Sequence, residues 1–185
     1  TVSNVELTQG IPISYKYTAA TSDVDQRYLL PNANIDTDTL TVTVQTSETE
    51  SASFAYDLAN DITTVNSTSK HYFLDAQDDG LFEVQFGDGI LGKEIANGNI
   101  ITLAGLVTDA GATNGCKSFS VVSSVGGYSN VQIITSTAAG GGVAQADIEE
   151  IKFNAPKNFD AQNRCVTVYD YVSLVKRDYP AAQSV

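Results

Sequence analysis

The amino-acid sequence predicts a mostly β protein of the α+β class, in which antiparallel strands form a sandwich or barrel-like body and a small helical module follows at the C-terminus. Two observations carry this prediction. Residues 2–137 consist largely of short segments rich in Val, Ile, Thr, Tyr and Phe, broken by Gly, Asn and Asp turns, which is typical of antiparallel strands. After them, a run of three glycines is followed by apolar residues at helical spacing. With 185 residues, the chain is long enough to bury its own core.

The clearest predicted strand is residues 39–46, where Leu40, Val42 and Val44 alternate with threonines. Alternation with a period of two places the apolar side chains on one face of a sheet and the threonines on the other. Further segments with the composition of strands are residues 11–18, 71–75, 81–86, 99–107, 117–125 and 130–136. Together these strands are enough for a sandwich or a barrel.

The predicted domain organisation has three parts, and the glycines at 140–142 mark the middle one. Because glycine has no side chain to pack, consecutive glycines favour a flexible backbone. The parts are a β-rich domain at residues 1–138, a Gly-rich linker at residues 139–145 and a helical module at residues 146–185.

Two helices are expected in the helical module. Ile148 and Ile151 lie three residues apart with acidic residues close by, and this pattern favours a short helix that ends near Pro156. A second helix is expected to begin at Thr167. Thr167 and Asp170 have the spacing of a capping box, in which Asp replaces the usual Glu or Gln.

Charge and composition exclude several classes of function. With 22 acidic against 10 basic residues, the formal charge of -12 repels phosphate groups, so no nucleic-acid partner is expected. No apolar run approaches the roughly 20 residues that span a bilayer, so no membrane association is expected. Only Cys116 and Cys165 are present, which leaves no disulfide framework or zinc-type spacing and favours a reducing compartment. Because the chain starts at Thr1 and contains no Met, we expect a fragment of a longer polypeptide.

The residues Gly87, Asp88, Gly89 and Gly92 match the G-x-G-x-x-G pattern of dinucleotide-binding proteins. A dinucleotide site also needs a long helix that begins within the motif, whereas an Asn-Gly turn at residues 97–98 follows almost at once. We therefore expect a glycine-dependent β-turn and no cofactor.

The sequence contains no evident catalytic or metal-binding motif. His71 is the only histidine and has no neighbouring nucleophile motif, so we expect a partly buried strand histidine and no enzymatic activity. Residues 75–80 are similar to the opening of a calcium-binding loop. Phe86 stands where the last carboxylate ligand is required, so we expect a polar hairpin turn instead.

Two groups of segments carry a family resemblance. The first group comprises residues 72–75 (YFLD), 79–93 (DGLFEVQFGDGILGK) and 97–100 (NGNI). The second comprises residues 151–159 (IKFNAPKNF) and 161–171 (AQNRCVTVYDY). Both resemble the baseplate wedge protein of T-even-type contractile-tailed bacteriophages and, more distantly, the baseplate J-like family. Cys165 departs from the alanine usual in that family.

The resemblance implies a structural role with no enzymatic reaction. It implies pairing with another copy in a ring, contacts with other baseplate wedge proteins, and a location in the virion tail baseplate after synthesis in the cytoplasm of the host bacterium. The main alternative is a carbohydrate-binding or adhesion module of a tail or surface protein. Such a module typically presents exposed aromatic platforms, and the chain has no Trp and only nine scattered Tyr.

The second group of segments also supplies candidate site residues for the turn between the two helices. Arg164 can bridge carbonyls or carboxylates with its planar fork of donors. The residues are expected either to lie beside an interface or only to stabilise that turn, and they are Ala155, Pro156, Gln162, Asn163, Arg164, Thr167, Asp170 and Tyr171.

Overall fold

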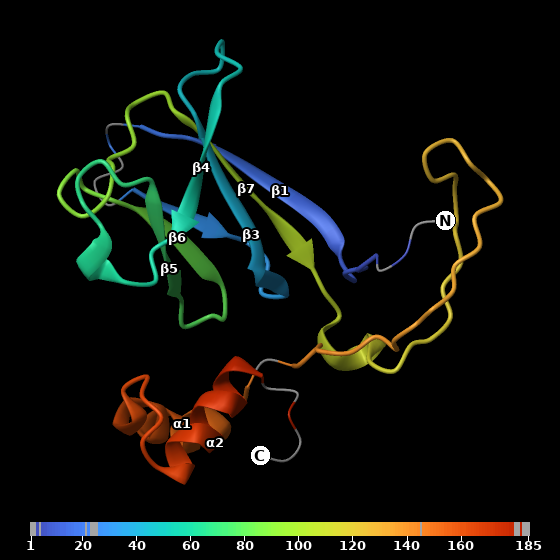
Figure 1. The fold of residues 1–185 in the computed structure, drawn as a ribbon. Coiled ribbons are helices and arrows are strands. Elements are labelled where there is room, and N and C mark those ends of the chain that lie inside the picture. Colours follow the sequence, from blue (N-terminus) through green and yellow to red (C-terminus); the bar gives the residue numbers. More distant parts are fainter. Residues whose placement is uncertain are drawn as a thin grey trace. The chain divides into compact units, whose positions relative to one another are not determined.

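The computed structural model describes residues 3, 5–20, 22, 26–144, 146–179 and 182. The chain divides into two compact units, Thr1–Thr108 and Asp109–Val185 (Figure 1). Among the described residues, the first unit contains a seven-stranded mixed sheet that is nearly closed into a barrel, and the second contains two α-helices. The predicted fold class, mostly β with C-terminal helices, is confirmed. The predicted linker and its boundaries stay a prediction, and Gln145 within it lies outside the described residues.

The strand order in the sheet is β1-β7-β3-β4-β5-β6-β2. The strands are β1 (Ile11–Thr18), β2 (Arg27–Leu30), β3 (Ile35–Gln45), β4 (Ser53–Leu58), β5 (His71–Ala76), β6 (Phe82–Phe86) and β7 (Ile100–Val107). All neighbours pair antiparallel except β4 and β5, which run parallel through two residue pairs. The prediction of antiparallel strands is therefore wrong at this one junction.

Two segments predicted as strands are not strands. Residues 117–125 and 130–136 have strand composition, but no ladder joins them, and the structure forms only one isolated bridge in this region, from Val125 to Tyr128. A two-stranded hairpin is only marginally stable without a third strand or a packing surface. This explains why the two segments have strand composition and yet form no ladder. Conversely, β2 and β4 are strands that the sequence pattern did not predict.

The core of the first unit lies on the inner face of the sheet. Leu40, Val42 and Val44 of β3 are all buried, as their alternation predicts. Aromatic rings from separate strands meet in edge-to-face geometry beside them. The ring centroid of Phe86 lies 5.4 Å from that of Tyr56 and 5.8 Å from that of Tyr28. Such ring contacts stabilise the fold beyond the effect of burying the rings' apolar area.

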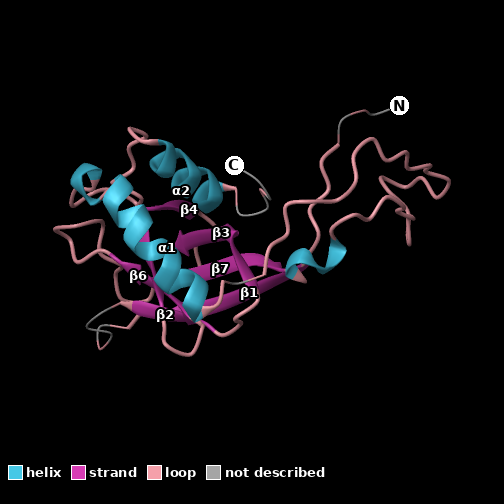
Figure 2. Cartoon of the chain, turned by 90° about the horizontal axis from the view of Figure 1, so that it is seen from below, coloured by secondary structure: helices cyan, strands magenta, loops and turns pink. Residues whose placement is uncertain are grey.

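The second unit contains a helical hairpin of α1 (Ile148–Ala161) and α2 (Val168–Asp178), shown in Figure 2. The prediction that the first helix ends near Pro156 is wrong, because α1 continues through that residue to Ala161. Proline removes one helical hydrogen bond. Both ends of α1 are nevertheless capped: the Asp147 side chain accepts a hydrogen bond from the Glu150 N–H, and Gln162 takes the left-handed conformation at the C-terminus.

Ahead of α1, the chain makes a long excursion that is closed at its base. The Gly115 N–H donates to the Ala139 carbonyl, and the Ala139 N–H donates to the Cys116 carbonyl, both at 2.8 Å. We call residues 116–139 the arm. Next to its base, the Asn114 side chain donates to the Gly142 carbonyl at 2.7 Å and accepts from the Gly142 N–H at 3.1 Å. Two short 3₁₀ helices, η1 (Ile62–Thr64) and η2 (Ala110–Thr113), complete the described elements.

Candidate functional site

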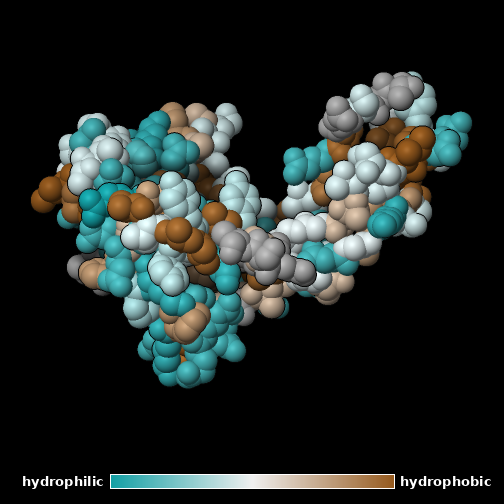
Figure 3. Space-filling view, turned by 60° about the horizontal axis from the view of Figure 1, so that its bottom comes forward, coloured by the Kyte–Doolittle hydropathy of each residue, from teal (hydrophilic) through white to brown (hydrophobic). Residues whose placement is uncertain are grey.

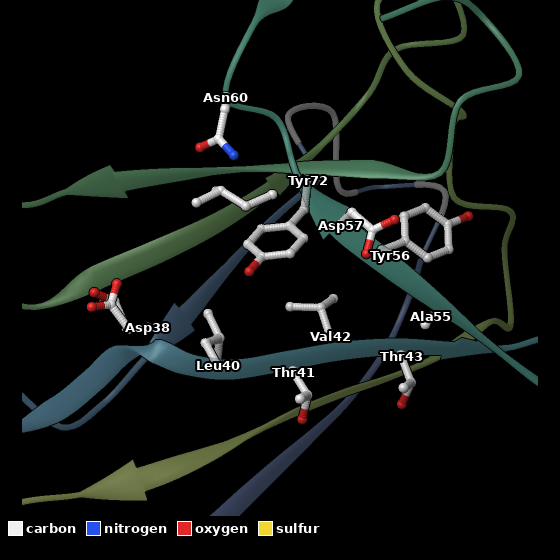
Figure 4. A pocket seen from close by; sticks show the side chains of 12 residues that line it. Asp38, Leu40, Thr41, Val42, Thr43, Ala55, Tyr56, Asp57, Asn60 and Tyr72 are labelled. Carbon is white, nitrogen blue, oxygen red and sulfur yellow. The ribbon is translucent and has the colours of Figure 1, made fainter.

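A groove opens in the wall of the sheet between β3 and β4 (Figure 4). These strands pair only from Val42 and Tyr56 to Gln45 and Ser53, and β4 then turns to pair with β5. The first half of β3 is left without β4 as a neighbour. The resulting groove has a volume of about 550 Å³.

The groove is lined by tyrosines, carboxylates and aliphatic side chains. In Figure 4 the Tyr72 side chain points into the opening, toward Leu40 and Val42. Burial raises the pKa of the Tyr72 hydroxyl, and the nearby Asp57 carboxylate adds to the rise. The lining residues include no histidine, cysteine, lysine or arginine. The groove therefore lacks the paired nucleophile and nitrogen base that most covalent mechanisms use.

The loop at residues 87–92 is a compact turn. Gly89 and Gly92 have φ angles of 83° and 91°, and the Gly89 N–H donates to the Gly92 carbonyl at 3.1 Å. A Cβ atom on Gly87 would overlap backbone atoms of Leu91 and Gly92. Glycine is therefore favoured at 89 and 92 by the positive φ angles and required at 87 by the close approach of the backbone. No helix follows within the described residues 93–99, so the geometry required for a dinucleotide is not formed.

Asp88 organises this turn from within. Its carboxylate accepts hydrogen bonds from the N–H groups of Ile90 and Leu91, each at 2.9 Å. The Leu91 N–H, and after it the Ile90 N–H, hold the pKa of the Asp88 carboxyl below its ordinary value. The partners of Asp88 are thus backbone groups of its own loop, which indicates a structural role for this residue.

The other polar motifs of the first unit are also structural in their contacts. Residues 77–81 form the turn between β5 and β6, in which the Asp79 side chain accepts from the Leu81 N–H at 3.0 Å. Arg27 of β2 approaches Asp75 at 3.2 Å and Glu83 at 3.4 Å. His71 is partly buried at the start of β5. Among the described residues, no group of three or more His, Cys, Asp or Glu side chains could hold a metal ion.

The connection between α1 and α2 contains four of the eight predicted turn residues: Gln162, Asn163, Arg164 and Thr167. Gln162 and Asn163 have φ angles of 46° and 56°, and the Arg164 N–H donates to the Ala161 carbonyl at 2.8 Å. The Arg164 guanidinium donates to the Gln162 side-chain oxygen at 2.7 Å, and Arg177 of α2 donates to the Asn163 side-chain oxygen. These contacts stabilise the turn in which the chain reverses direction between α1 and α2.

The capping box predicted at Thr167 and Asp170 is present. The Thr167 N–H holds the pKa of the Asp170 carboxyl below its ordinary value, and the Val166 N–H also lowers it. Ala155 and Pro156 were predicted to help fix the turn, but they lie inside α1, because the helix does not end at the proline. Tyr171 lies in the first turns of α2 with its side chain exposed.

Among the described residues, more large apolar side chains are exposed in the second unit than in the first. In the helical hairpin only Ala161 and Leu174 are buried among the described residues. Figure 3 shows apolar side chains on the surface of the chain, including the part that holds the arm. The exposed apolar residues of the hairpin are Ile148, Ile151, Phe153, Phe159, Val166, Val168, Tyr169, Tyr171 and Tyr179.

Comparisons with protein-family models and with curated proteins find no match to this chain. The baseplate wedge resemblance therefore stays a prediction that depends on the sequence motifs. No helix among the described residues has the length and apolar character needed to cross a membrane.

Proposed function

We propose that this chain is a structural component of a contractile-tail baseplate wedge, acting through self-association and through contacts with other baseplate proteins. The sequence motifs at residues 79–93 and 161–171 support the class of protein. The observation that carries the proposal is the exposed apolar surface of the helical hairpin. A pair of helices that buries little between its own members gains most from burial against a partner.

The proposal involves neither a reaction nor a cofactor. The predicted site residues act by holding loops in shape: Asp88 does so in the glycine turn, and Gln162, Asn163 and Asp170 do so between the helices. Rigid connections of this kind suit a subunit whose faces must meet several neighbours in a ring. The proposed location is the virion tail baseplate, after synthesis in the host bacterial cytoplasm.

The second candidate is a carbohydrate-binding or adhesion module, and the groove between β3 and β4 is the feature that favours it. Carboxylates of Asp38 and Asp57 could accept hydrogen bonds from sugar hydroxyls there. Its aromatic side chains, Tyr56 and Tyr72, are both buried and offer no open platform for a sugar ring. The baseplate role is therefore the stronger proposal.

The location of the chain in tail particles tests the proposed function. Gold-conjugated Fab fragments raised against the purified chain would be applied to contractile-tailed particles that carry it, with Fab pre-adsorbed on the chain as the control. We expect gold only at the baseplate, seen by electron microscopy. Gold at fibre or spike tips, together with glycan binding by the purified chain on an array, would contradict the baseplate role and support adhesion.

A further inference from the structure

The arm has the hydrogen bonds of a β-hairpin at its base and at its tip, but not between them. At the tip, the N–H groups of Val125 and Tyr128 each donate to the other residue's carbonyl, at 3.0 and 3.1 Å. Gly126 and Gly127 between them have φ angles of 57° and 87°. Positive φ at both central residues is the turn geometry that matches the twist of paired strands. Together with the closed base at Cys116 and Ala139, this defines a hairpin topology.

The middle of the arm is not paired in this structure. No backbone hydrogen bond joins residues 117–124 to residues 129–138, all of which are described. Two of its apolar side chains are largely exposed: Val122 is 98% exposed beside the partly buried Val121, and Ile134 is 85% exposed beside Ile133, at 37%. The arm thus has the composition and the turn of a β-ribbon and lacks the surface that would complete one.

The charge of the arm indicates what completes it. Lys117 at the base is the one charged residue of the arm: residues 118–146 contain no Asp, Glu, Lys, Arg or His, the longest uncharged run in a chain of net charge -12. Two copies of so acidic a chain repel one another over most of their surface, and they can approach at an uncharged element without that cost. A basic partner would instead be drawn to the acidic remainder of the chain.

We propose that the arm, residues 116–139, is a self-association element that completes its strands against the arm of a second copy of this chain, with Val122 and Ile134 at the contact. Identical arms offer each other equal numbers of unpaired backbone groups and exposed apolar side chains, as a two-fold symmetric contact requires. The inference rests on the self-association contained in the proposed function and names the surface responsible.

The test compares matched double variants of the full chain by sedimentation velocity over a concentration series. V122S/I134S removes the two outward apolar side chains of the arm. V5S/I90S removes two from outside the arm, where Val5 is 63% and Ile90 is 74% exposed. We expect the self-dissociation constant to rise about tenfold or more in the arm variant, because two apolar contacts are lost, and to change less than about twofold in the control.

Hydrogen exchange provides the second readout and does not depend on a variant that folds. In the wild type, amides of residues 117–124 and 129–137 should gain protection as protein concentration rises. The inference is overturned by unchanged association of V122S/I134S, by a wild type that stays monomeric, or by arm protection that is independent of concentration, which would mean packing within one chain. Gold labelling at the baseplate would still support the proposed baseplate location in each of these cases, so failure of the arm contact can be distinguished from failure of the baseplate assignment.

Discussion

Thr167 and Asp170 exchange two hydrogen bonds across the first turn of α2. The Asp170 N–H donates to the Thr167 hydroxyl oxygen at 3.3 Å, and the Thr167 N–H donates to the Asp170 carboxylate at 2.7 Å. The same carboxylate accepts from the Val166 N–H at 3.1 Å. N–H groups at the start of a helix have no partner within the helix, so this pair of side chains determines where α2 begins.

Removal of the Thr167 hydroxyl should therefore weaken the second unit. We expect Thr167→Ala to lower the free energy of unfolding of the helical hairpin by about 1 kcal/mol, the usual effect of losing an N-cap acceptor. Urea unfolding followed by far-UV circular dichroism measures this change. Thr167→Ser keeps the hydroxyl and should remain close to wild type. Equal loss in both variants would show that the cap is not the cause.

The lowered pKa of Asp170 makes the hairpin sensitive to acid. A carboxyl whose pKa is lower in the folded chain stabilises the fold above its unfolded pKa of about 3.9, and the effect is lost as pH falls through the lower folded value. Asp170→Asn should remove this contribution, so its helical stability should fall less than that of wild type as the pH is lowered from 5 to 2. Thermal unfolding at several pH values measures the difference.

Asp160→Asn is the matched control for this pH dependence, since Asp160 lies on α1 and its carboxylate makes no hydrogen bond with any residue that the structure describes. It should keep the pH dependence of wild type. If Asp170→Asn shows the same pH dependence as the control, the capping box is not the source of the acid sensitivity.

The close approach at Gly87 predicts a strong effect of the smallest side chain. We expect Gly87→Ala to destabilise the first unit by about 1–3 kcal/mol, because the added Cβ atom would overlap the backbone of residues 91–92 and the loop must shift. Gly140→Ala, where no atom lies within 4 Å of the added carbon, should be nearly neutral. Thermal unfolding of the two variants gives the comparison, and a neutral Gly87→Ala would refute the tight turn.

Ile101 of β7 is fully buried in the core of the first unit. Ile101→Ala should cost about 2–5 kcal/mol, through lost apolar burial and the cavity left behind. Ile90→Ala removes the same atoms from an exposed loop position and should change stability by less than about 0.5 kcal/mol. Urea midpoints measured by tyrosine fluorescence test this difference. Similar effects at both positions would mean that the barrel core is placed wrongly.

Features determined by a few adjacent residues were predictable from the sequence. The capping box, the glycine turn and the alternation along β3 each depend on residues within a short window. The strands β2 and β4 were missed because they are short, and because β4 pairs in parallel with β5 across the loop of residues 59–70. No local pattern records such a pairing.

The errors at Pro156 and in the arm have opposite causes. At Pro156 a local rule was overridden, since α1 is capped at both ends and continues through the proline despite one lost hydrogen bond. In the arm, the composition is that of strands, but composition alone does not form a ladder where no third strand or packing surface supports it. The exposed apolar side chains of the second unit were not predictable because burial depends on tertiary packing.

The most direct test of self-association is the solution mass of the purified wild-type chain, measured by sedimentation equilibrium from low to high micromolar concentration. The proposed structural role predicts a mass that rises with concentration from that of a monomer toward that of a dimer or a larger species. A constant monomer mass over the whole series would contradict self-association through the surfaces described for this chain.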